Sequence, residues 1–126
     1  MALLGACGSS GGGGVAANSD RPRTRATVEI VEPAPNATTG PDTTVRLRLT
    51  GGELIPGTQI SGGVQPRRGH IHLSVDGQLY SMTDSLTQEI RALTPGVHTV
   101  QAEFVAADHL PFRNRVVAAV SFEVGP

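Results

Sequence analysis

The sequence predicts an all-β domain, and more narrowly an antiparallel β-sandwich of about seven short strands. Short runs along the chain alternate between apolar and polar residues, which is the period of a strand with one buried face. Segments rich in Gly, Pro, Asn and Asp separate these runs, and no stretch carries the 3.6-residue period of an amphipathic helix. The single cysteine allows no internal disulfide, so apolar burial and backbone pairing must hold the domain together.

The first half of the domain contributes two predicted strands and a long loop. Residues 27–31 form a β-rich run in which Val28 and Ile30 share a face, and a turn-rich segment follows. Residues 44–50 place three apolar side chains on one face and two arginines on the other, as a half-buried strand does. The polar stretch 51–69, with six glycines and two prolines, is predicted to be a loop.

The next run, 70–76, alternates again, with apolar residues on one face and polar residues on the other. Its polar set is His70, His72, Ser74 and Asp76. The dipeptide Asp76-Gly77 is a tight hairpin signal that leads into a predicted strand over 78–82.

Three further predicted strands cover 88–92, 97–105 and 115–124, and Thr94-Pro95-Gly96 forms a turn between the first two. Seven short strands separated by turn signals are typical of an immunoglobulin-like sandwich with Greek-key connections. The predicted core contains Leu47, Leu73, Val75, Val100, Phe104 and Phe122.

The N-terminus resembles the export signal of bacterial lipoproteins. Residues 4–7 read Leu-Gly-Ala-Cys, like the lipobox in which the signal is cleaved before the cysteine and that cysteine is acylated, and this resemblance implies lipidation of Cys7. The Gly/Ser run that follows is typical of a flexible tether. Only Met1 to Leu4 precede the small residues of the lipobox, and this stretch is too short to be a full export signal. We therefore expect that the gene starts further upstream. Two alternatives stay open: a cytosolic start with a stray thiol, or a remnant of cloning.

This pattern divides the chain into a truncated signal plus tether over 1–26 and a sandwich domain over 27–126. The resemblance to lipoproteins implies a bacterial, extracytoplasmic and lipid-anchored location. No run reaches the roughly 18 apolar residues that a membrane-spanning helix needs. We therefore expect the chain to meet the membrane only through its lipid.

The domain itself resembles bacterial immunoglobulin-like modules, on the run 28–33 and the corner 93–100. It is similar, more narrowly, to an uncharacterised family of bacterial secreted domains that share three short motifs. Here these motifs read Gly-His-Ile-His from Gly69, Pro-Gly-Val-His-Thr from Pro95, and Asp-His-Leu-Pro from Asp108. The chain departs from the family in having Ile71 where another His is common, and it lacks a second His-rich segment. The resemblance covers about residues 28–124 and implies fold and export more than an activity.

A metal site is one hypothesis for the histidines. His70 and His72 lie two residues apart on a strand, so their rings share a face about 6.5–7 Å apart. In an immunoglobulin-like sandwich the start of this strand lies beside the loop that carries Asp108 and His109. Three imidazoles and a carboxylate are a set suited to Zn²⁺ or Cu²⁺. The alternative is that these are ordinary polar residues and that Asp108 only caps a turn.

His98 is expected at the opposite end of its strand, where a ring nitrogen would bond the backbone of the corner. No enzyme is predicted. His72, Ser74 and Asp76 lie in a row on one strand, too far apart for a nucleophile–base hydrogen bond, and the chain has no Gly-x-Ser-x-Gly elbow.

The amino-acid composition excludes some classes of binding partner. The net charge is −1, so no attraction to nucleic acid or to an anionic membrane face is expected. Aromatic residues make up only 3%, so stacking on bases is not expected either. Arg67 and Arg68 offer an anion site, with a solvated loop pair as the alternative. The sequence thus predicts a lipid-anchored binding or structural module of the cell envelope, whose partner is an unidentified envelope protein or polymer. The alternative is a periplasmic or surface copper- or zinc-binding protein.

Overall fold

A computed structural model describes residues 21–56 and 63–126, and every regular element among them is a β-strand. The strands are β1 (Thr27–Glu32), β2 (Thr38–Thr39), β3 (Thr43–Thr50), β4 (Glu53–Leu54), β5 (Arg68–Val75), β6 (Gln78–Thr83), β7 (Thr87–Ile90), β8 (Gly96–Ala106) and β9 (Pro111–Val124). Among the described residues there is no helix that is long and apolar enough to cross a membrane.

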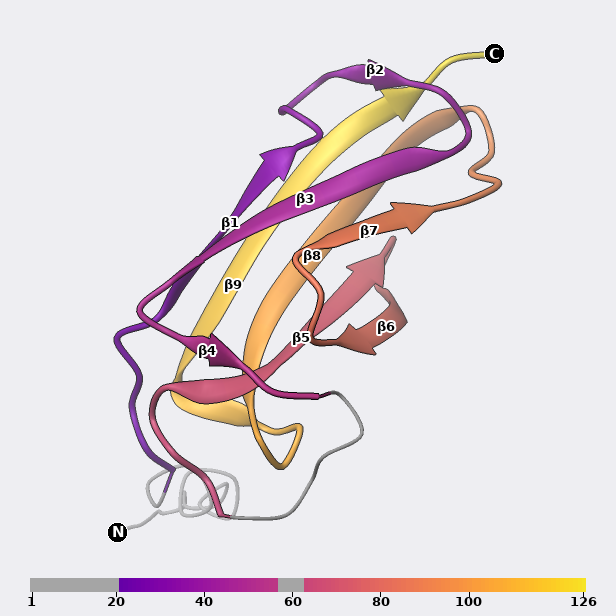
Figure 1. The fold of residues 1–126 in the computed structure, drawn as a ribbon. Coiled ribbons are helices and arrows are strands. Elements are labelled where there is room, and N and C mark those ends of the chain that lie inside the picture. Colours follow the sequence, from indigo (N-terminus) through magenta and orange to yellow (C-terminus); the bar gives the residue numbers. More distant parts are fainter. Residues whose placement is uncertain (1–20, 57–62) are drawn as a thin grey trace, which may run out of the picture.

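The strands form two sheets that pack face to face (Figure 1). One sheet has the order β1-β3-β7, and the other has the order β2-β9-β8-β5-β4, with β6 also paired to β5. The predicted immunoglobulin-like sandwich is confirmed, and all seven predicted strands are present within a few residues of their expected bounds. The sequence missed β2 and β4, because a two-residue parallel pairing is too short to show a period.

The core lies between the sheets and follows the predicted alternation. In the β1–β3 pair, Val28 is opposite Leu49 and Ile30 is opposite Leu47, so apolar side chains of both strands point inward together. Five of the six predicted core residues are buried, and they are Leu47, Leu73, Val100, Phe104 and Phe122. Val75, at the end of β5, is only partly buried but packs against the core.

Residues 21–26 also belong to the folded part, although the sequence assigns them to the tether. The backbone N–H of Arg113 donates to the carbonyl of Pro22 (2.9 Å). The side chain of Asn114 bonds the N–H and the carbonyl of Thr24, both at 2.9 Å. Thr24 and Ala26 are buried, so this segment is held along the start of β9 before it enters β1.

The end of the molecule where residue 21 lies is built around a close approach of β5 and β8. The pairing of β8 with β9 shifts register between Phe104 and Val105, whose partners change from Val116 to Pro111, whereas the pairing of β8 with β5 is regular. A Cβ placed on Gly69 would lie 1.8 Å from the carbonyl oxygen of Val105, so only glycine fits here. This contact brings the β8–β9 turn, residues 107–110, over the first residues of β5.

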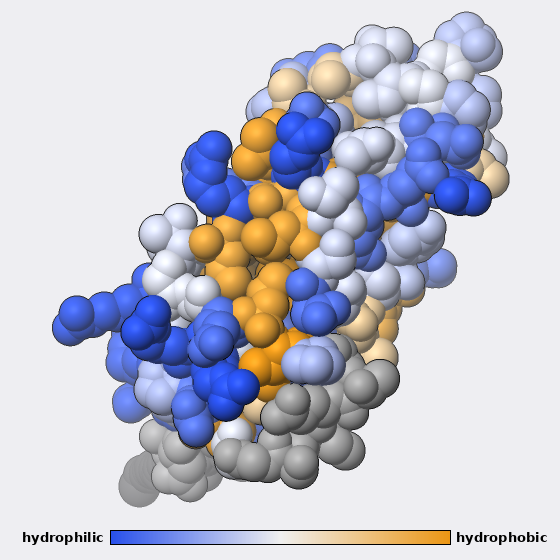
Figure 2. Space-filling view, viewed as in Figure 1, coloured by the Kyte–Doolittle hydropathy of each residue, from blue (hydrophilic) through white to orange (hydrophobic). Residues whose placement is uncertain are grey.

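The two ends of the described chain lie at opposite ends of the sandwich (Figure 1). In the same view, apolar side chains form a band through the middle of the face (Figure 2). Hydrophilic side chains gather at its lower left, toward the end where residue 21 lies (Figure 2). That end carries both the histidines of β5 and several arginines.

Candidate functional site

The structure brings together three of the residues that the sequence predicts as metal ligands. We call His70, His72 and His109 the histidine cluster. The ring centroids of His70 and His109 are 4.3 Å apart, and those of His72 and His109 are 5.5 Å apart. His72 Nε2 lies 3.4 Å from His109 Nδ1.

His109 reaches the cluster because of the turn that carries it. Its backbone is in the left-handed region, with a φ of 67°, and its N–H donates to the carbonyl of Ala106 (2.9 Å). The N–H of Leu110 donates to Asp108 Oδ1 (3.1 Å), which closes the turn further. These local bonds point the imidazole of His109 back over β5.

His70 is fully buried, with an exposed fraction of 0%. Its Nδ1 lies 3.1 Å from the carbonyl oxygen of Ile55, and its Nε2 lies 3.1 Å from that of Ala107. Both partners are acceptors, so the ring donates to both only when both nitrogens carry a proton. The alternation places His70 on the polar face of β5, but the segment after β4 and the β8–β9 turn cover that face here. His70 therefore links two loops and turns neither nitrogen toward a ligand.

Asp108 does not join the cluster. Its carboxylate accepts two hydrogen bonds from the guanidinium of Arg21, at 2.6 and 2.9 Å. The pKa of Asp108 is lowered, first by this hydrogen bond. The sequence could not pair these two residues because they are 87 positions apart.

The remaining pair, His72 and His109, lies in a partly buried site. The pKa of His72 is lowered, mainly by burial and then by the neighbouring His109, while Glu103 on β8 acts in the opposite direction. Glu103 lies opposite His72 in the β5–β8 register but is held by Arg115, whose Nε donates to it at 2.9 Å. Within the described ranges, no group of three His, Cys, Asp or Glu side chains is arranged to hold a metal ion.

His98 lies at the other end of the sheet. Its Nε2 is 2.7 Å from the carbonyl oxygen of Thr94, a backbone contact of the kind expected at this corner. Its Nδ1 is 2.7 Å from Asp76 Oδ2, and the N–H of Thr99 donates to Asp76 Oδ1 (2.9 Å). The pKa of His98 is raised, first by the hydrogen bond to Asp76, and that of Asp76 is lowered, first by the bond from Thr99.

The sequence analysis places Asp76 at the end of a strand and in the hairpin turn, and it misses the bond between Asp76 and His98. Asp76 and Gly77 do have positive φ angles, of 51° and 85°, as the predicted tight hairpin requires. The sequence does contain a hint of this bond, because the hairpin with Asp76 and the corner with His98 are expected at the same end of the sandwich. Cys7, the predicted lipidation site, lies outside the described residues.

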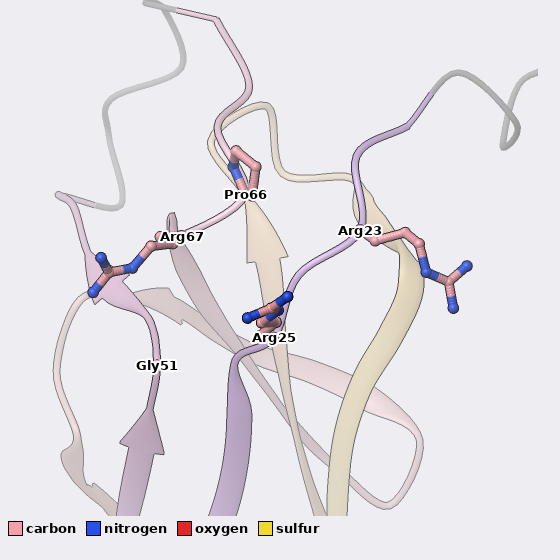
Figure 3. A pocket seen from close by; sticks show the side chains of 5 residues that line it. All are labelled: Arg23, Arg25, Gly51, Pro66 and Arg67. Carbon is pink, nitrogen blue, oxygen red and sulfur yellow. The ribbon is translucent and has the colours of Figure 1, made fainter.

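The end of the sandwich that carries the histidine cluster and residue 21 is called the histidine end below. It also contains a pocket of about 470 Å³ lined by Arg23, Arg25, Gly51, Pro66 and Arg67 (Figure 3). The sequence draws attention to Arg67 and Arg68, but Arg68 faces Glu53, with Nε 3.6 Å from its carboxylate. The sequence pattern does not single out Arg23 and Arg25, because it assigns both residues to the tether. Three exposed arginines around one pocket form a surface suited to anions.

No known family model matches the chain, and no curated protein sequence matches it. Its fold is similar to solved structures. The fibronectin(III)-like modules of Clostridium thermocellum CbhA match with a TM-score of 0.53 at 14% identity, over 79% of this chain and 96% of theirs. The CARDB domain of PF1109 from Pyrococcus furiosus matches with a TM-score of 0.51 at 17% identity, over 82% of this chain and 97% of that domain. These similarities establish a sandwich of the immunoglobulin-like and fibronectin(III)-like kind.

Proposed function

We propose that this chain is a lipid-tethered, extracytoplasmic binding or structural module of the bacterial cell envelope, without catalytic activity. The observation that carries the proposal is the combination of a two-sheet sandwich with a lipobox-like Leu-Gly-Ala-Cys ahead of it. Residue 21 lies at one end of the sandwich, so a tether attached there would leave the opposite end facing away from the membrane (Figure 1).

The arrangement of His72, Ser74 and Asp76 supports a binding role over a hydrolase. Asp76 bonds His98 and the backbone of Thr99, while His72 faces His109. His72 and Asp76 are therefore engaged at two different ends of the sheet, and neither is hydrogen-bonded to the hydroxyl of Ser74.

Fractionation of bacteria that express the full gene tests the anchor. The protein should partition into detergent with the membrane fraction, and Cys7→Ser should release it or leave it unprocessed. Ser9→Ala is the matched control, and it should fractionate like the parent. If Cys7→Ser fractionates like the parent as well, the lipid-anchor proposal is wrong.

A second candidate function, binding of Zn²⁺ or Cu²⁺, is favoured by one distance. Two imidazole nitrogens bound at about 2.0–2.1 Å to one tetrahedral ion lie about 3.3–3.4 Å apart. His72 Nε2 and His109 Nδ1 are 3.4 Å apart. In this second function, these two side chains bind the ion and water supplies its remaining ligands. His70 and Asp108 are not ligands, because His70 bonds backbone carbonyls and Asp108 is paired with Arg21.

Calorimetric titration of the full chain with Zn²⁺ and with Cu²⁺ tests this second function. One site should be lost in His72→Ala and in His109→Ala and retained in His98→Ala. The lowered pKa of His72 helps to keep its ring neutral, so affinity should fall only as the pH drops below about 6.5. Binding weaker than about 100 µM, or equal affinity in all three variants, would exclude the site.

A further inference from the structure

The charges of this domain are separated along its length, although the net charge is only −1. All ten basic residues are arginines. Six of them belong to the histidine end: Arg21, Arg23, Arg25, Arg67, Arg68 and Arg113. Toward the opposite end, four acidic residues lie at the end of β1, just after β5, near the end of β9 and in the turn before β3: Glu32, Asp76, Glu123 and Asp42.

Four of the six arginines have no acidic partner within residues 21–56 and 63–126. Arg21 is paired with Asp108 and Arg68 with Glu53. The four others are exposed, and we call them the arginine end: Arg23, Arg25, Arg67 and Arg113. They lie close together, because the backbone of Arg113 bonds that of Pro22, and Arg23, Arg25 and Arg67 line one pocket.

The geometry of this surface favours a spread array of anions over a single small one. Arg25 lies between Arg23 and Arg67, whose guanidinium groups extend to opposite sides (Figure 3). A site for one small anion would aim its donors at a common point. Guanidinium forks bind phosphate oxygens in a bidentate manner, so a row of them fits a surface that carries many phosphates.

The aromatic residues argue against nucleic acid as that surface. Phe104, Phe112 and Phe122 are all buried, and Tyr80 lies on β6, away from the pocket. The arginine end therefore offers phosphate contacts without a platform on which bases could stack. Phosphate headgroups of a lipid bilayer need no such platform.

We propose that the arginine end binds the phosphate headgroups of an anionic membrane and so lays this end of the sandwich on the bilayer. The inference rests on the proposed lipid tether in one respect only. Arg21 lies 14 positions after Cys7, and a chain of this length spans at most about 50 Å, so an anchored chain keeps the arginine end near the surface. The net charge of −1 does not reveal this surface, because it is the sum of the charges at two ends of opposite sign.

Cosedimentation of the full-length Cys7→Ser chain with lipid vesicles tests this proposal without any acyl anchor. The chain should bind vesicles containing phosphatidylglycerol and not those of phosphatidylcholine alone, and binding should weaken as salt is raised. Because the acyl chain is absent, this outcome does not depend on whether Cys7 is lipidated in cells.

A pair of matched variants locates the binding surface. The triple variant Arg23→Gln, Arg25→Gln, Arg67→Gln should lose roughly 100-fold in affinity, since each arginine near an anionic surface contributes about fivefold. The control Arg46→Gln, Arg48→Gln, Arg91→Gln has the same net charge but changes other faces, and it should bind like the parent. Thermal unfolding of both variants verifies that each is folded. An equal loss in the two variants, or equal binding to both kinds of vesicle, would overturn the proposal.

Two further probes test the choice of ligand. Inorganic phosphate at about 10 mM should leave vesicle binding nearly unchanged beyond the effect of matched ionic strength. Tight binding of inorganic phosphate that Arg25→Gln abolishes would replace the membrane by a small-anion site. Binding to duplex DNA that is tighter than binding to the anionic vesicles would likewise overturn the proposal.

Discussion

The two ends of the larger sheet use histidine in opposite ways. At the start of β5, His70 is fully buried between two backbone carbonyls, and burial lowers the pKa of His72 beside it. At the start of β8, His98 is bonded to a half-exposed carboxylate, that of Asp76, and its pKa is raised. The comparison shows that a strand position alone does not decide what a histidine does. The loops and turns that cover each end decide whether the ring meets carbonyls, another ring or a charge.

The largest expected effect comes from the tight packing of the histidine end. In Gly69→Ala the new Cβ would meet the backbone of Val105, so β5 and β8 must separate, and we expect a loss of about 3 kcal/mol or more in unfolding free energy. Gly77→Ala, in the hairpin near His98, has open space but a φ of +85°, and should cost about 1 kcal/mol. Urea unfolding measures both. Equal costs would show that the two ends are packed alike.

The second prediction compares the two bonded histidines directly. His70→Ala removes a buried ring and the hydrogen bond that it donates to the carbonyl of Ile55 or of Ala107, so we expect a loss of about 2–4 kcal/mol. His98→Ala should cost about 1 kcal/mol, since the partners of this ring lie closer to solvent. Denaturant titrations at pH 7 give both values. A larger cost for His98→Ala would reverse the comparison.

The third prediction uses pH to separate the ends. The raised pKa of His98 means that its contribution to stability is full below 6.5 and is lost as the pH rises through the raised value. The lowered pKa of His72 means the reverse, a contribution present above 6.5 and lost as the pH falls below it. Unfolding free energies should therefore show His98→Gln most damaging near pH 5.5, and His72→Gln most damaging near pH 8. The same pH trend in both variants would contradict the assigned environments.

The smallest expected effect on stability is that of Asp76→Asn. This change keeps an acceptor for Thr99 but removes the negative charge beside His98, and it should cost about 0.5–1 kcal/mol. NMR titration should show the pKa of His98 falling toward 6.5, while that of His72 stays where it is. An unchanged titration of His98 would mean that Asp76 is not the source of its raised pKa.

The sequence by itself determined the strands and the inward faces. Period-two alternation is a local property, so residues such as Leu47, Leu73 and Phe104 could be assigned to the core without knowing their neighbours. The Asp76-Gly77 turn was equally readable, because its backbone conformation depends on two adjacent residues.

Only the tertiary structure decided which polar residues meet. His70 is buried by backbone 15 and 37 positions away, and Asp108 is taken by Arg21 from 87 positions away. The arginine pocket likewise combines Arg25 with Arg67, which no local pattern connects. A periodic pattern shows which face of a strand is apolar. Which loop covers the end of a sheet, and which residue pairs with a charged side chain, depend on segments that are distant in the sequence.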